Sequence, residues 1–139
     1  MSVNAIDQAL IGALANDATL SALAPGGVFR GVAPQSVSAP YVIVDMVTAE
    51  DMPQLQFGTA FESLLYLVKA VAPGTSAGAA QSAADRVHVL LQNAVLSISG
   101  YRCMLCQREE RIAYVEINDS SDLRYQHRGG LYRVMVDPV

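Results

Sequence analysis

The clearest pattern along the chain is a stretch from Ser76 to Ala94 in which apolar residues recur at spacings of three and four. This spacing places them on one face of a helix with 3.6 residues per turn, and polar side chains take the opposite face. Thr75 or Ser76 can cap the first turn, because a side-chain oxygen there accepts an otherwise unpaired backbone N–H. We predict a long central helix that buries Ala80, Ala83, Ala84, Val87, Leu90, Leu91 and Ala94.

A second amphipathic pattern begins the chain, and it predicts a first helix from Val3 to Leu14. Asp17 can cap a further short helical turn that contains Leu20 to Leu23. The run Pro25-Gly26-Gly27 then stops this helical part. The apolar face of the first helix consists of Ala5, Ile6, Ala9, Leu10, Ala13 and Leu14.

Runs of β-branched and apolar residues predict the strands. Phe61–Ala72 is continuously apolar, which is typical of a central strand covered on both faces. Gly129 and Gly130 predict a bulge or bend in the last strand. The other expected strands are Val28–Val32, Tyr41–Val47, Leu96–Ile98, Tyr101–Arg108, Ile112–Asn118 and Arg124–Val136, with Tyr101–Arg108 and Ile112–Asn118 either joined by or continuous through residues 109–111.

Two polar stretches are predicted as connections. Thr48–Gly58 contains Pro53 near its middle, and a connection of this length inside a compact domain is either functional or a mobile hairpin tip. Asp119–Asp122 is expected to form a polar turn, and it lacks the alternating acids and glycine of a calcium loop.

Together these elements predict an α+β fold. We expect a single domain over residues 1–139, with a mostly antiparallel β-sheet on which an N-terminal helix and one long central helix pack. No apolar run approaches the ~18 residues of a membrane span, and the start of the chain lacks the basic segment of a signal peptide. No membrane partner is therefore expected.

Charge is unevenly distributed along the chain. The net charge is −4, all of it from residues 1–100, whereas residues 101–139 hold six arginines and six acids. This acidic balance disfavours a sequence-independent grip on nucleic acid, which needs a basic face. Eight of the nine cationic side chains are arginines, and either subunit interfaces, which favour arginine over lysine, or genome base composition accounts for this bias.

Candidate catalytic and metal-binding residues are few. Cys103 and Cys106 have CxxC spacing, but in a predicted strand residues three apart point to opposite faces, so we expect small buried thiols. A zinc site would need two further ligands, and the only histidines are His88 and His127. His127 has no evident partner that would orient it as a general base. We therefore expect no catalytic residue, no metal and no cofactor.

Four segments in this order resemble the phage tail-terminator and tail-completion proteins, the small neck proteins of long-tailed phages. The opening helix and turn, the first strands, the alanine-rich helix and the closing strand carry the resemblance, whereas Thr48–Phe57 shows no family pattern. The segments are Asp17–Leu23 with Val28–Val32, Ala33–Gln35 with Pro40–Val44, Ala83–Val87 with Leu90, Leu91 and Leu96–Tyr101, and Tyr125–Val134.

The resemblance implies a structural protein of the virion, made in the host cytoplasm and placed at the tail–neck junction. Such proteins form a homo-oligomeric ring, expected to be a hexamer, that caps the tail tube, stops its growth and joins the head connector. Genomic DNA passes through the lumen without specific binding. On this basis Glu50, Asp51 and Glu62 are candidates for lumen-facing or tube-facing charge. Tyr125, His127, Arg128 and Arg133 are candidates for subunit contacts along an outer strand.

Two other interpretations stay open. A head-completion or adaptor protein would lie one ring nearer the capsid. A small enzyme or ligand-binding domain would be a monomer with one large apolar pocket.

Overall fold

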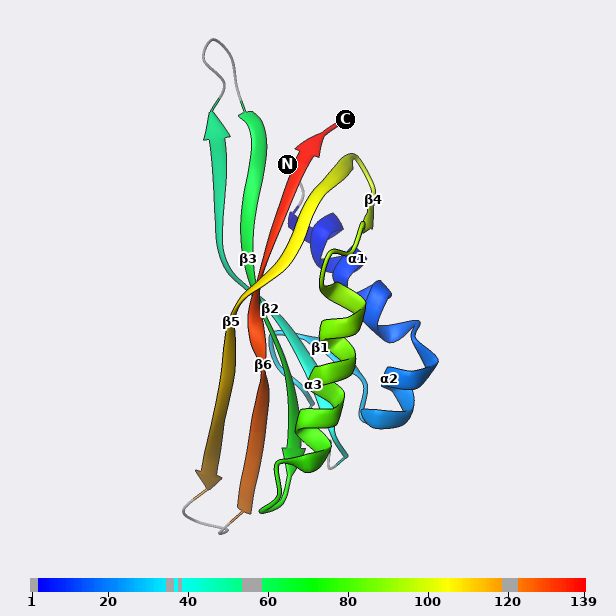
Figure 1. The fold of residues 1–139 in the computed structure, drawn as a ribbon, viewed down its shortest axis with the longest axis vertical. Helices are drawn as coiled ribbons and strands as arrows, with labels where there is room; N and C mark the ends of the chain where they lie inside the picture. Colours follow the sequence, from blue (N-terminus) through cyan, green and yellow to red (C-terminus); the bar gives the residue numbers. More distant parts are fainter. Residues whose placement is uncertain (1–2, 35–36, 38, 54–58, 119–122) are drawn as a thin grey trace.

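The computed structural model of the chain describes residues 3–34, 37, 39–53, 59–118 and 123–139. The strands form one six-stranded sheet in the order β1-β2-β3-β6-β5-β4, with β1 and β2 parallel and the other neighbours antiparallel (Figure 1). The fold is therefore α+β with a mixed sheet. The elements are α1 (Val3–Ala15), α2 (Ala18–Leu23), β1 (Val28–Arg30), β2 (Tyr41–Pro53), β3 (Thr59–Pro73), α3 (Gly78–Leu91), β4 (Ser97–Ile98), β5 (Tyr101–Asn118) and β6 (Leu123–Pro138).

All three helices lie on one face of the strongly twisted sheet, and we call the other face the open face (Figure 1). The hydrophobic core fills the space between the helices and strands β2, β3 and β6. Tyr66 and Tyr132 are the largest fully buried side chains, and the Tyr66 hydroxyl donates a hydrogen bond to the Asp7 carboxylate on α1. As the apolar run predicts, β3 is an inner strand, paired with β2 on one side and β6 on the other.

The central helix is confirmed, with somewhat narrower bounds than the sequence predicts. Five of its seven expected apolar side chains are buried, and Leu90 and Ala94 are partly buried. Ala77 is the N-cap residue and makes no side-chain capping bond, but the Ser76 hydroxyl accepts a hydrogen bond from the Gly78 N–H at 3.2 Å. The small side chains in the first half of α3, Ala80, Ala83 and Ala84, are all buried.

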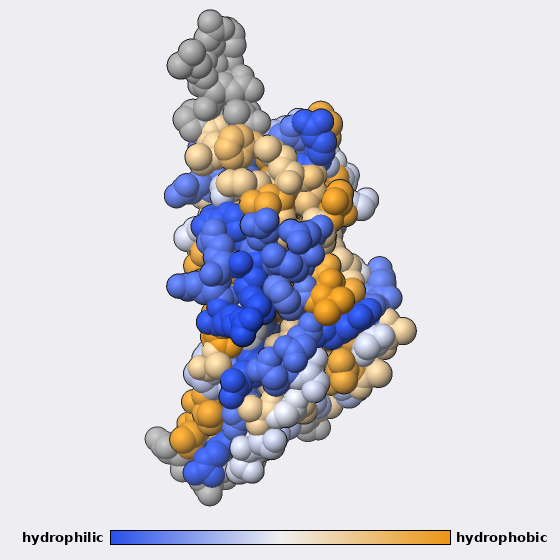
Figure 2. All heavy atoms as spheres, in the orientation of Figure 1, coloured by the Kyte–Doolittle hydropathy of each residue, from blue (hydrophilic) through white to orange (hydrophobic). Residues whose placement is uncertain are grey.

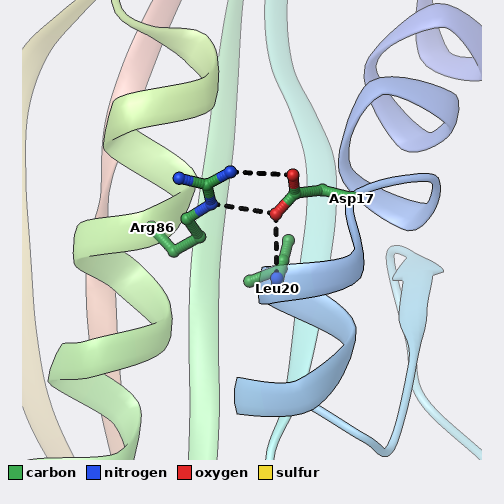
Figure 3. A network of polar contacts seen from close by, with 3 residues as sticks. All are labelled: Asp17, Leu20 and Arg86. Carbon is green, nitrogen blue, oxygen red and sulfur yellow. Dashed lines mark hydrogen bonds and ion pairs between the residues drawn. The ribbon is translucent and has the colours of Figure 1, made fainter.

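Asp17 caps α2 as expected and also joins this helix to α3 (Figure 3). Its carboxylate accepts the Leu20 N–H at 2.8 Å and two hydrogen bonds from the Arg86 guanidinium, at 2.8 and 2.9 Å. The Arg86 hydrogen bonds, followed by the Leu20 N–H, lower the pKa of Asp17 from 3.8 to about 2. Bidentate pairs of this kind fix geometry as well as adding energy.

We therefore expect Asp17 to make the fold acid-sensitive. The folded-state pKa lies below the unfolded value, so the stabilisation is complete above about pH 4 and is lost as the pH falls towards about 2. The Asp17→Asn variant keeps the cap but loses the charge, so its melting temperature should be lower than wild type at pH 7 and equal to it at pH 2. Circular dichroism melts across this range test the prediction, and Arg86→Gln should reproduce the effect. Parallel curves for wild type and both variants would contradict it.

Two sequence expectations about connections need correction. Residues 48–53 belong to β2, where they pair with β3 up to Thr59, so they are not part of a loop. Residues 54–58 and the expected turn at 119–122 lie outside the described residues. Conversely, β5 runs without a break from Tyr101 to Asn118, which confirms the continuous alternative.

Gly129 and Gly130 are expected to mark a bulge or a bend, and the bulge alternative is wrong in position. Both glycines pair regularly with β3 and β5, and the register shift lies on the neighbouring strand, between Arg108 and Glu110. The glycines are needed for close packing instead. A Cβ at Gly129 would lie 2.2 Å from the Val68 carbonyl oxygen, and one at Gly130 would lie 2.6 Å from the Glu110 carbonyl oxygen.

Candidate functional site

Two pairs of long strands reach opposite ends of the long axis of the molecule (Figure 1). Strands β2 and β3 form one arm, and strands β5 and β6 form the other. They contain 13, 15, 18 and 16 residues, respectively, whereas typical strands have about 5–6. Each arm nevertheless carries apolar side chains that the rest of the chain leaves about half exposed, among them Val47 on β2 and Val115 and Ile117 on β5. These surfaces are available to other molecules.

The candidate acids lie on the β2–β3 arm but do not share one environment. Glu50 and Asp51 are exposed, and as neighbours in a strand they point to opposite faces. Glu62 on β3 pairs with Asp51 in the register, yet it is only 4% exposed and its Oε2 has no hydrogen-bond partner. In the single chain, Glu62 thus presents no charge to solvent. Glu50 and Asp51 are the exposed candidates.

The four candidate contact residues share β6, which is an inner strand and not an outer one. It pairs with β3 on one side and with β5 on the other. Along these paired residues, its backbone cannot pair with a strand of a neighbouring molecule. The alternation along the strand places Tyr125, His127 and Arg133 on the open face and Arg128 on the helix-covered face. The strand therefore does not bring the four residues together.

His127 sits in a compact group of side chains on the open face. Its ring stacks on Tyr114 with centroids 4.3 Å apart, and Lys69 Nζ donates to the Tyr114 hydroxyl at 2.7 Å. His127 Nε2 lies 2.8 Å from Glu116 Oε1, and because a carboxylate only accepts, this nitrogen carries the proton. Burial lowers the pKa of His127 below its usual 6.5, so the ring is neutral at pH 7.

Arg133 is already engaged within its own chain. Its guanidinium makes two hydrogen bonds to the Glu109 carboxylate, each 3.1 Å, and a third to the Ser63 hydroxyl at 3.1 Å. These bonds tie β6 to β5 and β3 across the open face. A subunit contact made by Arg133 would therefore come from this preformed pair and not from a free cation.

Arg128 lines a cleft of about 420 Å³ between α3 and strands β5 and β6. Arg108 and Arg111 line it too, and burial together with these two cations lowers the pKa of His88 on the opposite wall. The Arg128 Nε is buried and has no hydrogen-bond partner. Figure 2 shows hydrophilic atoms gathered across the middle of this face, where β5 crosses in front of the body. The six arginines after residue 100 hint at this cluster, but only the strand register brings the three together.

Contrary to the prediction from their spacing, Cys103 and Cys106 do not point to opposite faces of the strand. A register shift between Cys103 and Leu105 changes the alternation, so Cys103 and Cys106 pair with Val136 and Val134 and lie on the same, helix-covered face. Both are free thiols, and burial raises the pKa of Cys106 to about 12, which makes it unreactive. Among the described residues there is no group of three or more metal-ligating acids, histidines or cysteines.

Residues 8–137 match the family model of the tail completion protein gp17, which covers nearly the whole chain. The chain belongs to this tail completion family. It is therefore a tail-associated structural component of a phage-like virion, as the resemblance in its sequence implies. Among curated proteins, no sequence matches the chain.

Solved structures share the fold of this tail completion family member. A chain from the virion of a native gene transfer agent particle has a TM-score of 0.71 at 19% identity, with 99% of each chain covered. A second solved structure has a TM-score of 0.61 at 14% identity and covers 100% of this chain and 96% of its own. At these identities the likeness establishes the fold alone.

Membership of the family points to a structural role and not to catalysis. The sequence did not reveal which surfaces serve that role, since the arms became apparent only from strand pairing. No described helix is long and apolar enough to cross a membrane.

Proposed function

We propose that this tail completion family member assembles into a ring that caps the tail tube, stops its polymerisation and joins the tail to the head connector. The observation that carries the proposal is the pair of arms, on which several apolar side chains stay about half exposed in the single chain. On the β5–β6 arm, Val115, Ile117 and Leu123 are 48%, 52% and 50% exposed, and on β2 Val47 is 49% exposed. Figure 2 shows hydrophobic atoms at the lower end of β5.

Exposed apolar groups at the ends of rigid arms support assembly better than they support a monomer. Burying them against neighbours gains about 25 cal/mol per Å² of apolar surface removed from water. Long strands also hold these groups in place before contact, which reduces the entropy lost on association. A ring of identical copies uses both arms of every subunit, one on each side.

The charged candidates are assigned within this ring as proposals. Glu50 faces the tube or the lumen, where acidic side chains repel DNA and let it slide. Asp51 points to the opposite face of β2 and is assigned to a contact between copies. Arg128 makes a subunit contact from the cleft that it lines. Tyr125, His127 and Arg133 contribute to contacts through the open face, which they share.

Tail-tube protein that polymerises in vitro provides the test. Added substoichiometrically, the protein should stop tube growth and be found at one tube end by electron microscopy. The Glu50→Gln variant should cap roughly tenfold more weakly, because small contributions from exposed charges multiply around a ring. The control variant Gln8→Lys changes the net charge equally at an exposed position of α1 and should cap normally.

Two outcomes would contradict the proposal. Tubes that grow unchanged with saturating protein would exclude capping. Binding only to DNA-filled heads, and never to tubes, would place the protein one ring nearer the capsid. Equal weakening by both variants would remove the specific role of Glu50 while leaving capping intact.

A further inference from the structure

The two outer strands of the sheet cover only small parts of their neighbours. Strand β1 pairs with three residues of β2, Val42 to Val44, and β4 pairs with Tyr101 and Arg102 of β5. Among the described residues, no further strand pairs with the outer edge of β2 after Val44 or of β5 after Arg102. Unpaired edges of this length are a liability in a free protein and are normally blocked or used.

Contacts with the end of α3 show which groups of β5 point outward. The Asn93 N–H donates to the Cys106 carbonyl at 2.8 Å, and the Arg108 N–H donates to the Gln92 side chain at 3.0 Å. In an antiparallel pair, the backbone groups of alternate residues point away from the partner strand. Counting on from Arg108 through the register shift identifies the next residues of β5 whose N–H and C=O groups point away from β6. They are Arg111, Ala113, Val115 and Ile117, which leaves four N–H and four C=O groups directed away from β6.

The same reasoning applies to the outer edge of β2. The Val42 N–H donates to the Gly27 carbonyl, and the Val44 carbonyl accepts the Gly31 N–H, so these residues face β1 and the segment that follows it. Beyond β1, the residues of β2 whose N–H and C=O groups point away from β3 are Met46, Ala49 and Asp51. This count allows for the register shift between Met46 and Thr48. This edge continues along the arm to Pro53, which has no N–H to donate.

We propose that the β5 edge of one copy pairs with the β2 edge of the next copy, so that the sheet continues from subunit to subunit. The inference rests on the ring proposed above and names its contact. Within the chain β2 and β5 run in opposite directions, because each strand from β2 through β3 and β6 to β5 is antiparallel to its neighbour. When two copies have the same orientation, β5 of one copy and β2 of the next therefore pair as antiparallel strands.

Charge complementarity favours a second copy as the occupant. Arg111 is the charged side chain among the outward-facing residues of the β5 edge, and Asp51 is the charged one on the β2 edge. Both side chains are exposed and lie on the helix-covered face of the sheet, so they meet on one face after pairing. Pairing would also cover Val115 and Ile117, which are about half exposed in the single chain.

The position of the two edges fits a closed assembly. The free part of β5 lies at one end of the long axis of the molecule and the free part of β2 lies at the other (Figure 1). Neighbours that pair in this way are offset along the strands, and a sheet closes into a barrel only with such a stagger and tilt. Different edges meet at every contact, which is the head-to-tail arrangement that generates rings.

The Ala113→Pro variant tests the pairing. Proline removes an outward-facing N–H but no bond to β6, so the fold should persist while edge pairing is blocked. The Ala113→Thr control keeps the N–H. Analytical ultracentrifugation and electron microscopy, with and without tail tubes, should find Ala113→Pro at the subunit mass of 14.8 kDa and Ala113→Thr in rings like the wild type.

A charge exchange provides an independent test that needs no proline. Arg111→Glu alone should prevent ring formation, and adding Asp51→Arg should restore it, whereas Gln107→Glu on the open face of β5 should have no effect. Rings formed by wild type, Ala113→Pro and Arg111→Glu alike would overturn the edge pairing and leave the proposed function standing. The absence of wild-type rings, even on tail tubes, would overturn both.

Discussion

Replacing Gly129 with alanine is expected to destabilise the fold by about 3 kcal/mol or more. The new Cβ would lie 2.2 Å from the Val68 carbonyl oxygen and 2.5 Å from the Lys69 Cα. Both atoms belong to the backbone of β3, an inner strand held on both sides, so neither can move away cheaply. Urea denaturation followed by circular dichroism measures the loss, or shows an unfolded protein.

The matched control for Gly129→Ala is the same substitution at Gly12 on α1. Apart from its chain neighbours and the backbone of its own helix, no described atom lies within 4 Å of a Cβ built at that position. Alanine within a helix is favoured over glycine by about 0.5–1 kcal/mol, so Gly12→Ala should stabilise the protein slightly. Similar stabilities for the two variants would show that β3 and β6 do not approach each other as closely as described.

Leu91→Ala is expected to cost about 2–5 kcal/mol, because it removes a fully buried side chain from the contact between α3 and the sheet. Val89→Ala on the same helix is the control, since Val89 is 66% exposed and should change stability by less than about 0.5 kcal/mol. Denaturation midpoints of the two variants measure the difference. A small effect at Leu91 would contradict the packing of the central helix.

Helical periodicity predicted α1 and α3 and nearly all of their buried residues, because an amphipathic helix on a core leaves a clear pattern. Residues 48–53 were predicted wrongly, because Glu50, Asp51 and Pro53 are typical of a loop. That segment of β2 extends on an arm, so its side chains show no buried and exposed alternation, and its pairing with β3 defines the strand. Local composition carries no record of such long-range pairing.

Strand order was the other limit of the sequence analysis. A continuous apolar run correctly indicated β3 as an inner strand, but β6 carries mixed polarity and was taken for an outer one. Several of its polar side chains bind cross-strand partners instead of solvent, as Arg133 binds Glu109 and Ser63 and His127 binds Glu116. The arginine cleft could not be predicted either, since Arg108 and Arg128 come from two strands and meet only in the register of the folded sheet.

The central claim is that copies of this tail completion family member close into a ring on the tail tube. Electron microscopy of purified tails, compared with tails assembled without the protein, tests it most directly. We expect a closed ring of identical copies, coaxial with the tube and present at one end of it, and overlong open-ended tubes when the protein is missing. Normal tails in its absence, or isolated copies bound without closing a ring, would contradict the account.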